Sequence, residues 1–202
     1  MPPTSGTSTT GGSDIDVLGI SGSLRQGSYN TLLVRAACHL APDGMTIRTY
    51  QGMRDLPHYD QDLDADPTPE PVVRLREEIH RADGLLIITP EYNYSIPGSL
   101  KNLIDWASRP YDAAALTGKP AAIATAAPTN FGGLRAQLAL RQIFLWTGTE
   151  VVSKPEVTVT EVHGCFDDRG NLTDGDVTHL VTELLEGLAA KIRKGRAATL
   201  TP

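Results

Sequence analysis

Short apolar runs alternate along the chain with longer stretches in which apolar residues recur every three or four positions. The apolar runs predict strands at 15–20, 45–50, 84–90, 119–128 and 150–159. The recurring pattern predicts helices at 28–41, 69–82, 100–108, 132–148 and about 176–194. The Ser-, Thr-, Gly- and Pro-rich segment 1–14 is expected to be a disordered tail, and 196–202 a flexible one.

Details of the pattern place individual elements within a sheet. The run 84–90 is the most hydrophobic and is expected at the centre, whereas 45–50 alternates and is expected nearer an edge. Pro155 interrupts the last strand, and Asp174 is placed to cap the last helix. That helix carries its apolar stripe at Val177, Val181, Leu184, Leu188 and Ile192.

The regular alternation of strands and helices predicts a parallel sheet, because parallel strands need long crossovers and these are right-handed. We therefore expect one α/β domain over 15–195, a three-layer sandwich with a five-stranded sheet in the order 2-1-3-4-5. In such sheets ligands bind beyond the carboxyl ends of the strands, where the strand order reverses. The loops after Ile20, Thr89 and Thr125 are expected to meet there.

Composition narrows the class of partner. The 202 residues carry a net charge of −6, so nucleic acid is not expected as the main partner, since phosphate backbones are bound through clustered Lys and Arg. Cys38 and Cys165 belong to no C-x-x-C pair, and a disulfide between them is not expected. The N-terminus does not read as a signal peptide and no apolar run is long enough to cross a membrane, so a cytoplasmic location is expected.

The loop SGSLRQGSYN, residues 21–30, has the features of a phosphate site. The loop carries hydroxyl and amide side chains at Ser21, Ser23, Ser28 and Asn30, and the hydroxyl of Thr31 follows directly. A helix N-terminus suits an anion, and Arg25 adds a guanidinium whose fork matches phosphate oxygens. The G-x-G-x-x-G pattern is absent, and so is the lysine of a triphosphate loop, since the first lysine is Lys101. A single phosphate group is favoured; the alternative is a turn that merely caps the helix.

The other two loops suit a flat ring. In TPEYNYSIPGSLKN, residues 89–102, two prolines stiffen a segment with aromatic side chains and exposed amide groups, which fits a heteroaromatic ligand. The alternative there is an ordinary tyrosine-containing turn. In ATAAPTNFGG, residues 124–133, small residues permit close approach and Thr125 can hydrogen-bond a ligand edge.

Four segments together resemble the NADPH-dependent FMN reductase family of flavodoxin-like proteins: GISGSLRQGSYN, LPHYDQD, TPEYNYSIPGSLKNLIDWAS and FGGLRAQLALRQ. The resemblance covers about residues 15 to 190. The family includes chromate- and quinone-reducing flavoproteins. It implies a flavodoxin-like fold with FMN at the switch point and NADPH or NADH as co-substrate.

The resemblance also assigns roles by position. It places the FMN phosphate among Ser21, Ser23, Arg25, Ser28, Asn30 and Thr31. It places the isoalloxazine against Pro90, Glu91, Tyr92 and Asn93, and the other ring edge against Thr125 to Pro128 and Gly132. The third loop is poorer in Ser and Gly than is usual in the family. Arg135 is kept where related reductases use an Arg and a Tyr in a subunit contact, but AQLAL after it holds no Tyr.

The expected activity is hydride transfer from NAD(P)H to bound FMN, followed by electron transfer to an acceptor that takes the same place. A quinone is preferred over a free flavin, an azo compound or a metal oxyanion such as chromate. No side chain is expected to be catalytic, and the five scattered histidines and the acidic run 60–66 predict no metal site. The alternatives are a flavodoxin-like electron carrier reduced by a protein partner and a non-catalytic flavin or nucleotide sensor.

A homodimer or homotetramer is also expected. The family commonly completes its FMN site across subunits. The apolar faces of helices 100–108 and 132–147, with Trp106, Phe144 and Trp146, exceed what one sheet obviously covers. Core packing of these side chains is the alternative.

Overall fold

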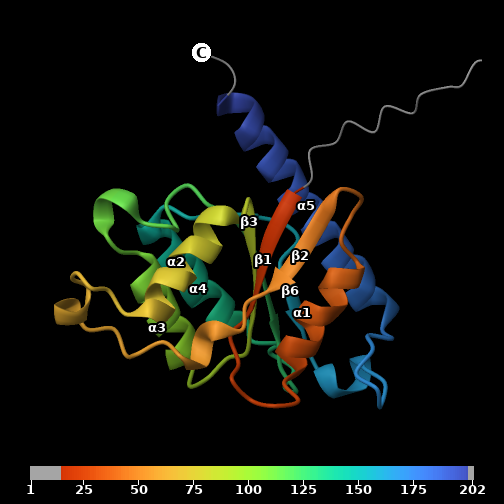
Figure 1. Ribbon diagram of the computed structural model, residues 1–202. Coiled ribbons are helices and arrows are strands. Elements are labelled where there is room, and N and C mark those ends of the chain that lie inside the picture. Colours follow the sequence, from red (N-terminus) through yellow and green to blue (C-terminus); the bar gives the residue numbers. More distant parts are fainter. Residues whose placement is uncertain (1–14, 200–202) are drawn as a thin grey trace, which may run out of the picture.

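The computed structural model describes residues 15–199 (Figure 1). The segments 1–14 and 200–202, part of the expected tails, lie outside the described residues. The strands are β1 (Ile15–Ser21), β2 (Met45–Thr49), β3 (Gly84–Thr89), β4 (Pro120–Ala126), β5 (Glu150–Val151) and β6 (Val157–Val159). The α-helices are α1 (Tyr29–His39), α2 (Glu70–Arg81), α3 (Gly98–Ala107), α4 (Leu134–Thr147) and α5 (Gly175–Thr199). Single 3₁₀ turns are η1 (Gly52–Arg54), η2 (Gln61–Leu63), η3 (Tyr111–Ala113) and η4 (Val162–Cys165).

The sheet is parallel throughout and has the order β2-β1-β3-β4-β5, so the predicted order is confirmed. The predicted strand 150–159 differs: it forms two short strands, β5 and β6, which both pair with β4. Pro155 lies between them, and proline has no N–H for a sheet ladder. Thr89 and Thr125 pair at the carboxyl ends of β3 and β4, so the loops that follow these strands start level with each other.

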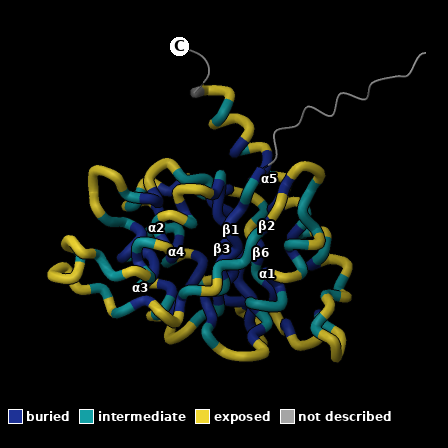
Figure 2. The backbone as a smooth tube through the Cα atoms, in the orientation of Figure 1, coloured by how far each residue is buried: buried dark blue, intermediate teal, exposed yellow. Residues whose placement is uncertain are grey.

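Helices cover both faces of the sheet, as the alternation predicts (Figure 1). α1 and α5 pack on one face, and α2, α3 and α4 on the other, each over its own apolar cluster. All of β3 is buried between the two layers, and the predicted stripe of α5 is buried too (Figure 2). α5 continues to Thr199 and projects beyond the sheet, and Arg196 forms an ion pair with Asp83 at 2.6 Å, so the chain is helical where the flexible tail was expected to start.

The long loop between β2 and α2 is anchored at one acidic residue. Asp60, Asp62 and Asp66 are exposed, as expected of a solvated acidic run, but the Asp64 side chain is only 8% exposed. It pairs with Arg76 at 2.7 Å and with Arg109 at 3.2 Å. Burial alone would raise the pKa of Asp64, but the hydrogen bonds from both guanidinium groups outweigh it and lower that pKa. The loop is therefore fixed to α2 and to the end of α3.

The three large aromatic residues of α3 and α4 do not share one exposed face. Trp106 and Phe144 are fully buried in the core beneath these helices, which corrects the expectation that they contribute to an uncovered apolar face. Trp146 is 85% exposed and its neighbour Leu145 83%. The apolar side chains that remain uncovered thus lie on the outer surface of α4.

Candidate functional site

The first loop lies directly on the central strand. The backbone N–H of Gly22 donates to the Ile88 carbonyl at 2.8 Å, continuing the β1–β3 pairing by one residue. A Cβ atom at Gly22 would stand 2.2 Å from Oγ1 of Thr89 and 2.6 Å from its Cβ. Only glycine lets the loop cross β3 this closely. The loop then turns back over the carboxyl end of the sheet, at the bottom of Figure 1.

The first turn of α1 faces a cavity with its N–H groups uncapped. Ser28 is the N-cap residue and is almost completely buried, but its hydroxyl does not cap the helix. Ser28, Tyr29 and Asn30 line the cavity, together with Arg25. Within residues 15–199 the Arg25 guanidinium forms no ion pair. Free helix N–H groups, a buried hydroxyl and an uncompensated guanidinium form a site for a phosphate group.

Two polar pairs hold this loop in place. Asn30 donates through Nδ2 to the Ala126 carbonyl at 3.0 Å and accepts from the Ala126 N–H at 3.2 Å. It thereby ties the start of α1 to the end of β4. The hydroxyl groups of Ser21 and Thr31 lie 2.8 Å apart and close the base of the loop. The predicted phosphate ligands thus include residues that shape the site as well as line it.

The second loop is a tight turn with two left-handed residues. Tyr92 and Ser95 exchange backbone hydrogen bonds of 2.9 Å and 3.1 Å around Asn93 and Tyr94, whose φ angles are 50° and 68°. This is the pattern of a type I′ turn, which asparagine tolerates well and tyrosine poorly. A surrounding contact is therefore needed to hold Tyr94.

Arg135 provides that contact. Its guanidinium carbon lies 4.0 Å from the ring centroid of Tyr94 and 4.4 Å from that of Phe131. Its Nη1 donates to Oε1 of Glu91 at 2.9 Å, and its backbone N–H donates to Oε2 at 3.0 Å. Glu91 therefore caps the N-terminus of α4 from the second loop, where a carboxylate is favoured by the helix dipole. One arginine joins the second loop, the third loop and α4.

The third loop is shaped by close glycine contacts. Gly132 and Gly133 have φ angles of 55° and 84°. A Cβ at Gly133 would stand 2.9 Å from Cβ of Thr125, and one at Gly132 would meet the backbone of Thr158 at 3.1 Å. Thr125 is buried beneath Gly133, and its hydroxyl has no hydrogen-bond partner among the described residues.

The three loops enclose a cavity of about 530 Å³, within the usual size of a small-molecule site. Of the predicted site residues, it is lined by Ser23, Arg25, Ser28, Asn30, Pro90, Glu91, Tyr92 and Pro128. Ser21 and Thr31 line an adjoining hollow of about 270 Å³, which also includes Ser23 and Arg25. Asn93, Thr125 and Gly132 lie outside both sets of lining residues.

Ala126 and Ala127, within the predicted segment 125–128, line the cavity as well. The cavity also has walls that the sequence did not assign to the ligand: Tyr29, Thr129, Phe131, Arg135 and Val162. Tyr29 and Phe131 lie inside or beside the predicted loops, so their place in the sequence could have suggested them. Val162 belongs to η4, and no sequence pattern signals that this turn returns to the site.

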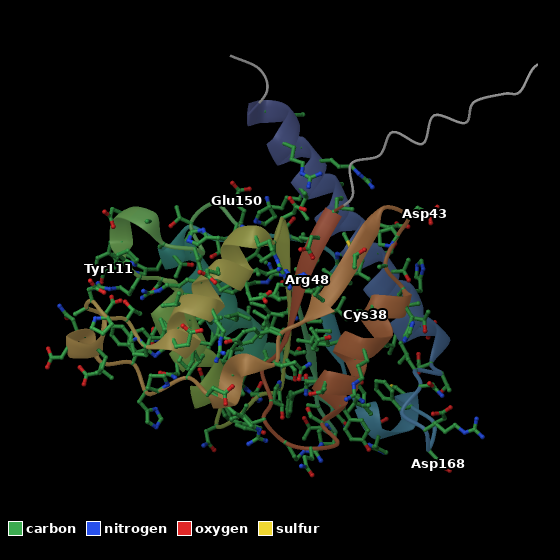
Figure 3. All side chains as sticks on the ribbon, in the orientation of Figure 1. Cys38, Asp43, Arg48, Tyr111, Glu150 and Asp168 are labelled. Atoms are coloured by element: carbon green, nitrogen blue, oxygen red, sulfur yellow. The ribbon has the colours of Figure 1, made fainter. Side chains whose placement is uncertain are left out.

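Two cysteines lie in the part of the chain that the structure describes. Cys38, labelled on α1 in Figure 3, and Cys165 in η4 are free thiols. Burial, reinforced by Asp174, raises the pKa of Cys165, which keeps it protonated. Over residues 15–199 no group of three or more His, Cys, Asp or Glu side chains is placed to hold a metal ion. In the same residues no helix has the length and apolar character needed to span a membrane.

Comparison with known proteins gives consistent matches over the whole domain. A model of the NADPH-dependent FMN reductase family matches residues 15–164. An NAD(P)H-dependent FMN reductase of Pseudomonas aeruginosa is 45% identical over 183 residues, which cover 91% of this chain and 98% of the relative. A quinone reductase of Escherichia coli is 40% identical over 173 residues, covering 84% of this chain and 92% of the relative.

A solved structure agrees with these matches. The flavoenzyme NAD(P)H:(acceptor) oxidoreductase FerB from Paracoccus denitrificans superposes with a TM-score of 0.82 at 37% identity. The match covers 89% of this chain and 98% of FerB. The similarity therefore includes the three loops and the helices that carry them.

Proposed function

The chain belongs to the NADPH-dependent FMN reductase family, and we propose that it holds FMN in the cavity between its three loops, with the residues identified above. It is an NAD(P)H-dependent flavin oxidoreductase with FMN as cofactor and quinones as electron acceptors. The observation that carries the assignment of the site is the cavity of about 530 Å³, with a phosphate cradle at one end and rigid loops at the other.

The residues present fit the phosphate of FMN. The N–H groups in the first turn of α1 are uncapped, the Ser28 hydroxyl lies among them, and Arg25 has no acidic partner in the described part of the chain. Together they provide donors and positive charge for one phosphate group. Ser23 also lines the cavity, and its hydroxyl accepts from the Arg25 N–H at 3.3 Å.

The residues present also fit a flat ring. Pro90, Glu91 and Tyr92 form one wall and Ala126 to Thr129 the other. The Glu91 carboxylate is held by Arg135 and is therefore not free to bind the ligand. Small residues in the third loop keep the opposite wall close. When bound, FMN supplies the two-electron exchange between NAD(P)H and the acceptor.

The chain's own contribution is binding and orientation. The cavity mouth carries the partly exposed rings of Tyr92 and Phe131, which suit a planar nicotinamide or quinone. Arg135 lies at the same mouth, where Glu91 fixes its guanidinium and balances its charge. We expect no side chain to act as acid or base, because the flavin carries the hydride.

An anaerobic reduction experiment tests this function. FMN-loaded protein is expected to lose its visible absorbance on addition of NADPH or NADH alone, and to recover it when benzoquinone is added. The flavin absorbance at about 450 nm reports both halves of the reaction. Persistent colour with either nucleotide, and bleaching only with an added partner reductase, would assign the protein as an electron carrier instead.

We also propose that a second copy of the chain covers the outer surface of α4. Leu134, Leu138 and Leu145 lie on one face of this helix at spacings of four and seven residues, and Trp146 extends the patch. An apolar face of this kind is unusual on a monomer. The patch begins beside Phe131, at the mouth of the cavity.

The oligomer is tested by light scattering after size-exclusion chromatography. The wild-type chain of 21.7 kDa is expected to elute as a dimer or tetramer, and Leu138→Asp/Leu145→Asp to shift to the monomer mass. Leu63→Asp, on the exposed turn η2, is the matched control and should keep the wild-type mass. A monomeric wild-type protein would contradict the proposal.

A further inference from the structure

A second cavity, of about 370 Å³, lies between α1 and the segment that leads into α5. Its lining shares no residue with that of the cofactor cavity. α1 contributes Leu32, Arg35, Ala36 and His39, and Leu40 caps its end; the opposite wall is Arg169 to Leu172 with Thr178. The sheet-facing residues of α1 are different ones, so this cavity lies on the other side of the helix.

The cavity has an apolar floor. Leu32, Ala36, Leu40 and Leu172 are half-buried, and Leu40 and Leu172 pack against the core under α1. Gly170 lets the loop approach closely, since a Cβ there would stand 3.0 Å from Cδ2 of Leu32. The floor is thus a fixed surface between a helix and a loop.

The rim carries two arginines. Arg35 and Arg169 are exposed at its edge, beside the exposed His39, and no Asp or Glu belongs to the lining. Neither Arg35 nor Arg169 forms an ion pair with any described residue. Most other arginines that line cavities or pack between elements are paired, as Arg48 and Arg76 are. In a chain with a net charge of −6, two uncompensated guanidinium groups facing one cavity are an exception to the general pattern.

The acidic residues beside Arg169 do not neutralise this rim. The Asp167 carboxylate accepts from the N–H groups of Arg169 and Asn171 and from Asn171 Nδ2, so it is directed into its own loop. Asp168 lies at the outer edge of the molecule in Figure 3 and is exposed. The charge facing the cavity is therefore positive.

We propose that this cavity binds a small organic anion with an apolar body, of the alkyl or aryl carboxylate class. The carboxylate would lie between Arg35 and Arg169, whose fork geometry suits its two oxygens. The apolar body would cover the leucine floor. A cavity of about 370 Å³ is within the range that small ligands occupy.

The site is connected to the cofactor cavity through α1. Tyr29 opens this helix and lines the cofactor cavity, and its ring packs on that of Phe166 with centroids 5.9 Å apart. Phe166 precedes the loop that forms the outer wall of the second cavity. The proposed ligand therefore binds away from the reaction, on the helix that also carries the phosphate cradle.

Titration of the FMN-loaded, ¹⁵N-labelled protein with octanoate tests the proposal. Octanoate is expected to shift the amide signals of residues 32–40 and 169–172, whereas 1-octanol at the same concentration shifts them little. Arg35→Gln/Arg169→Gln should raise the octanoate dissociation constant about tenfold, since two charge-assisted hydrogen bonds are lost. Arg193→Gln, an exposed arginine on α5 outside the cavity, should leave the dissociation constant within about twofold of wild type.

Each outcome decides the question. All three arginines are exposed, so the variants are expected to keep the wild-type melting temperature. Equal affinity for octanoate in the double variant and wild type would overturn the proposal. So would shifts confined to other parts of the protein, or equal binding of octanoate and 1-octanol. Binding of inorganic phosphate as tight as that of octanoate would also overturn it, because the apolar floor would then contribute nothing.

Discussion

Gly22→Ala is expected to raise the FMN dissociation constant at least about 100-fold and to lower the free energy of unfolding by about 3 kcal/mol. The new Cβ would lie 2.2 Å, 2.6 Å and 3.1 Å from Oγ1, Cβ and Cα of Thr89. A side-chain rotation removes only the first of these contacts. The other two involve the buried central strand, so the loop itself must move away from β3.

That movement would disrupt the phosphate cradle. The Gly22 N–H donates to the Ile88 carbonyl at 2.8 Å, and displacement of the loop breaks this bond. Ser23 and Arg25 belong to the same loop as Gly22. They would therefore move away from the first turn of α1. The steric overlap and the displacement of the phosphate-binding side chains both weaken FMN binding, which is why the expected effect is large.

Quenching of FMN fluorescence gives the dissociation constant, and urea unfolding of the apoprotein gives the stability. Gly98→Ala is the matched control, because a Cβ there meets nothing within 4 Å and its backbone is helical. Gly27→Ala has equally open space but a φ of 63°, so it should cost only the left-handed strain of about 1 kcal/mol. An FMN affinity of Gly22→Ala within about threefold of wild type would show that the loop is not seated on β3 as described.

The order of the sheet followed from local patterns. The run 84–90 is the most hydrophobic of the predicted strands, which favours a strand buried on both faces, and all of β3 is buried. Crossover handedness then fixes which loops meet. Ser28 opens a helix and Pro90 directly follows a strand, and both line the cavity; that they bind a cofactor remains a prediction.

Contacts between distant segments were not predictable in the same way. Asn30 is paired with Ala126, 96 residues away, and the pattern of polar residues around Asn30 fits a phosphate ligand just as well. Asp64 reads as one of several solvated acids, and only the fold brings Arg76 and Arg109 to it. Val162 reaches the cavity through an irregular segment that has no periodicity.

In α4, hydrophobic periodicity does not predict which side chains are buried. Its apolar residues occur almost all round the axis, so the sequence did not separate the buried Phe144 from the exposed Leu145 and Trp146. The contacts of Arg135 within the chain were not predicted from the sequence either. The resemblance linked it to a subunit contact, whereas within one chain it already binds Glu91 and stacks on Tyr94.

Arg135→Met is expected to lower the free energy of unfolding by about 2–3 kcal/mol and the FMN affinity about 30-fold. The Glu91 side chain is only 13% exposed and that of Arg135 29%, so removal of the guanidinium leaves a carboxylate with little water around it. The left-handed Tyr94 also loses the cation above its ring. The second loop should therefore loosen, and with it one wall of the cofactor cavity.

A double-mutant cycle separates this link from a simple loss of charge. Arg135→Met, Glu91→Gln and the combined variant should give a coupling energy above about 1 kcal/mol in urea unfolding of the apoprotein. Arg74→Met and Glu70→Gln form the control cycle. These residues are more than half exposed and 3.8 Å apart on α2, so their coupling should stay below about 0.5 kcal/mol.

The FMN affinities of the same variants decide what the pair does for the site. If the pair fixes the second loop, Glu91→Gln alone should weaken FMN binding less than Arg135→Met, because the amide oxygen still accepts from the Arg135 N–H. The Arg74 variant should bind FMN as the wild type does. Equal FMN affinities in Arg135→Met and wild type, with the stability lowered as expected, would mean that the Glu91–Arg135 pair stabilises the fold and has no part in shaping the cofactor cavity.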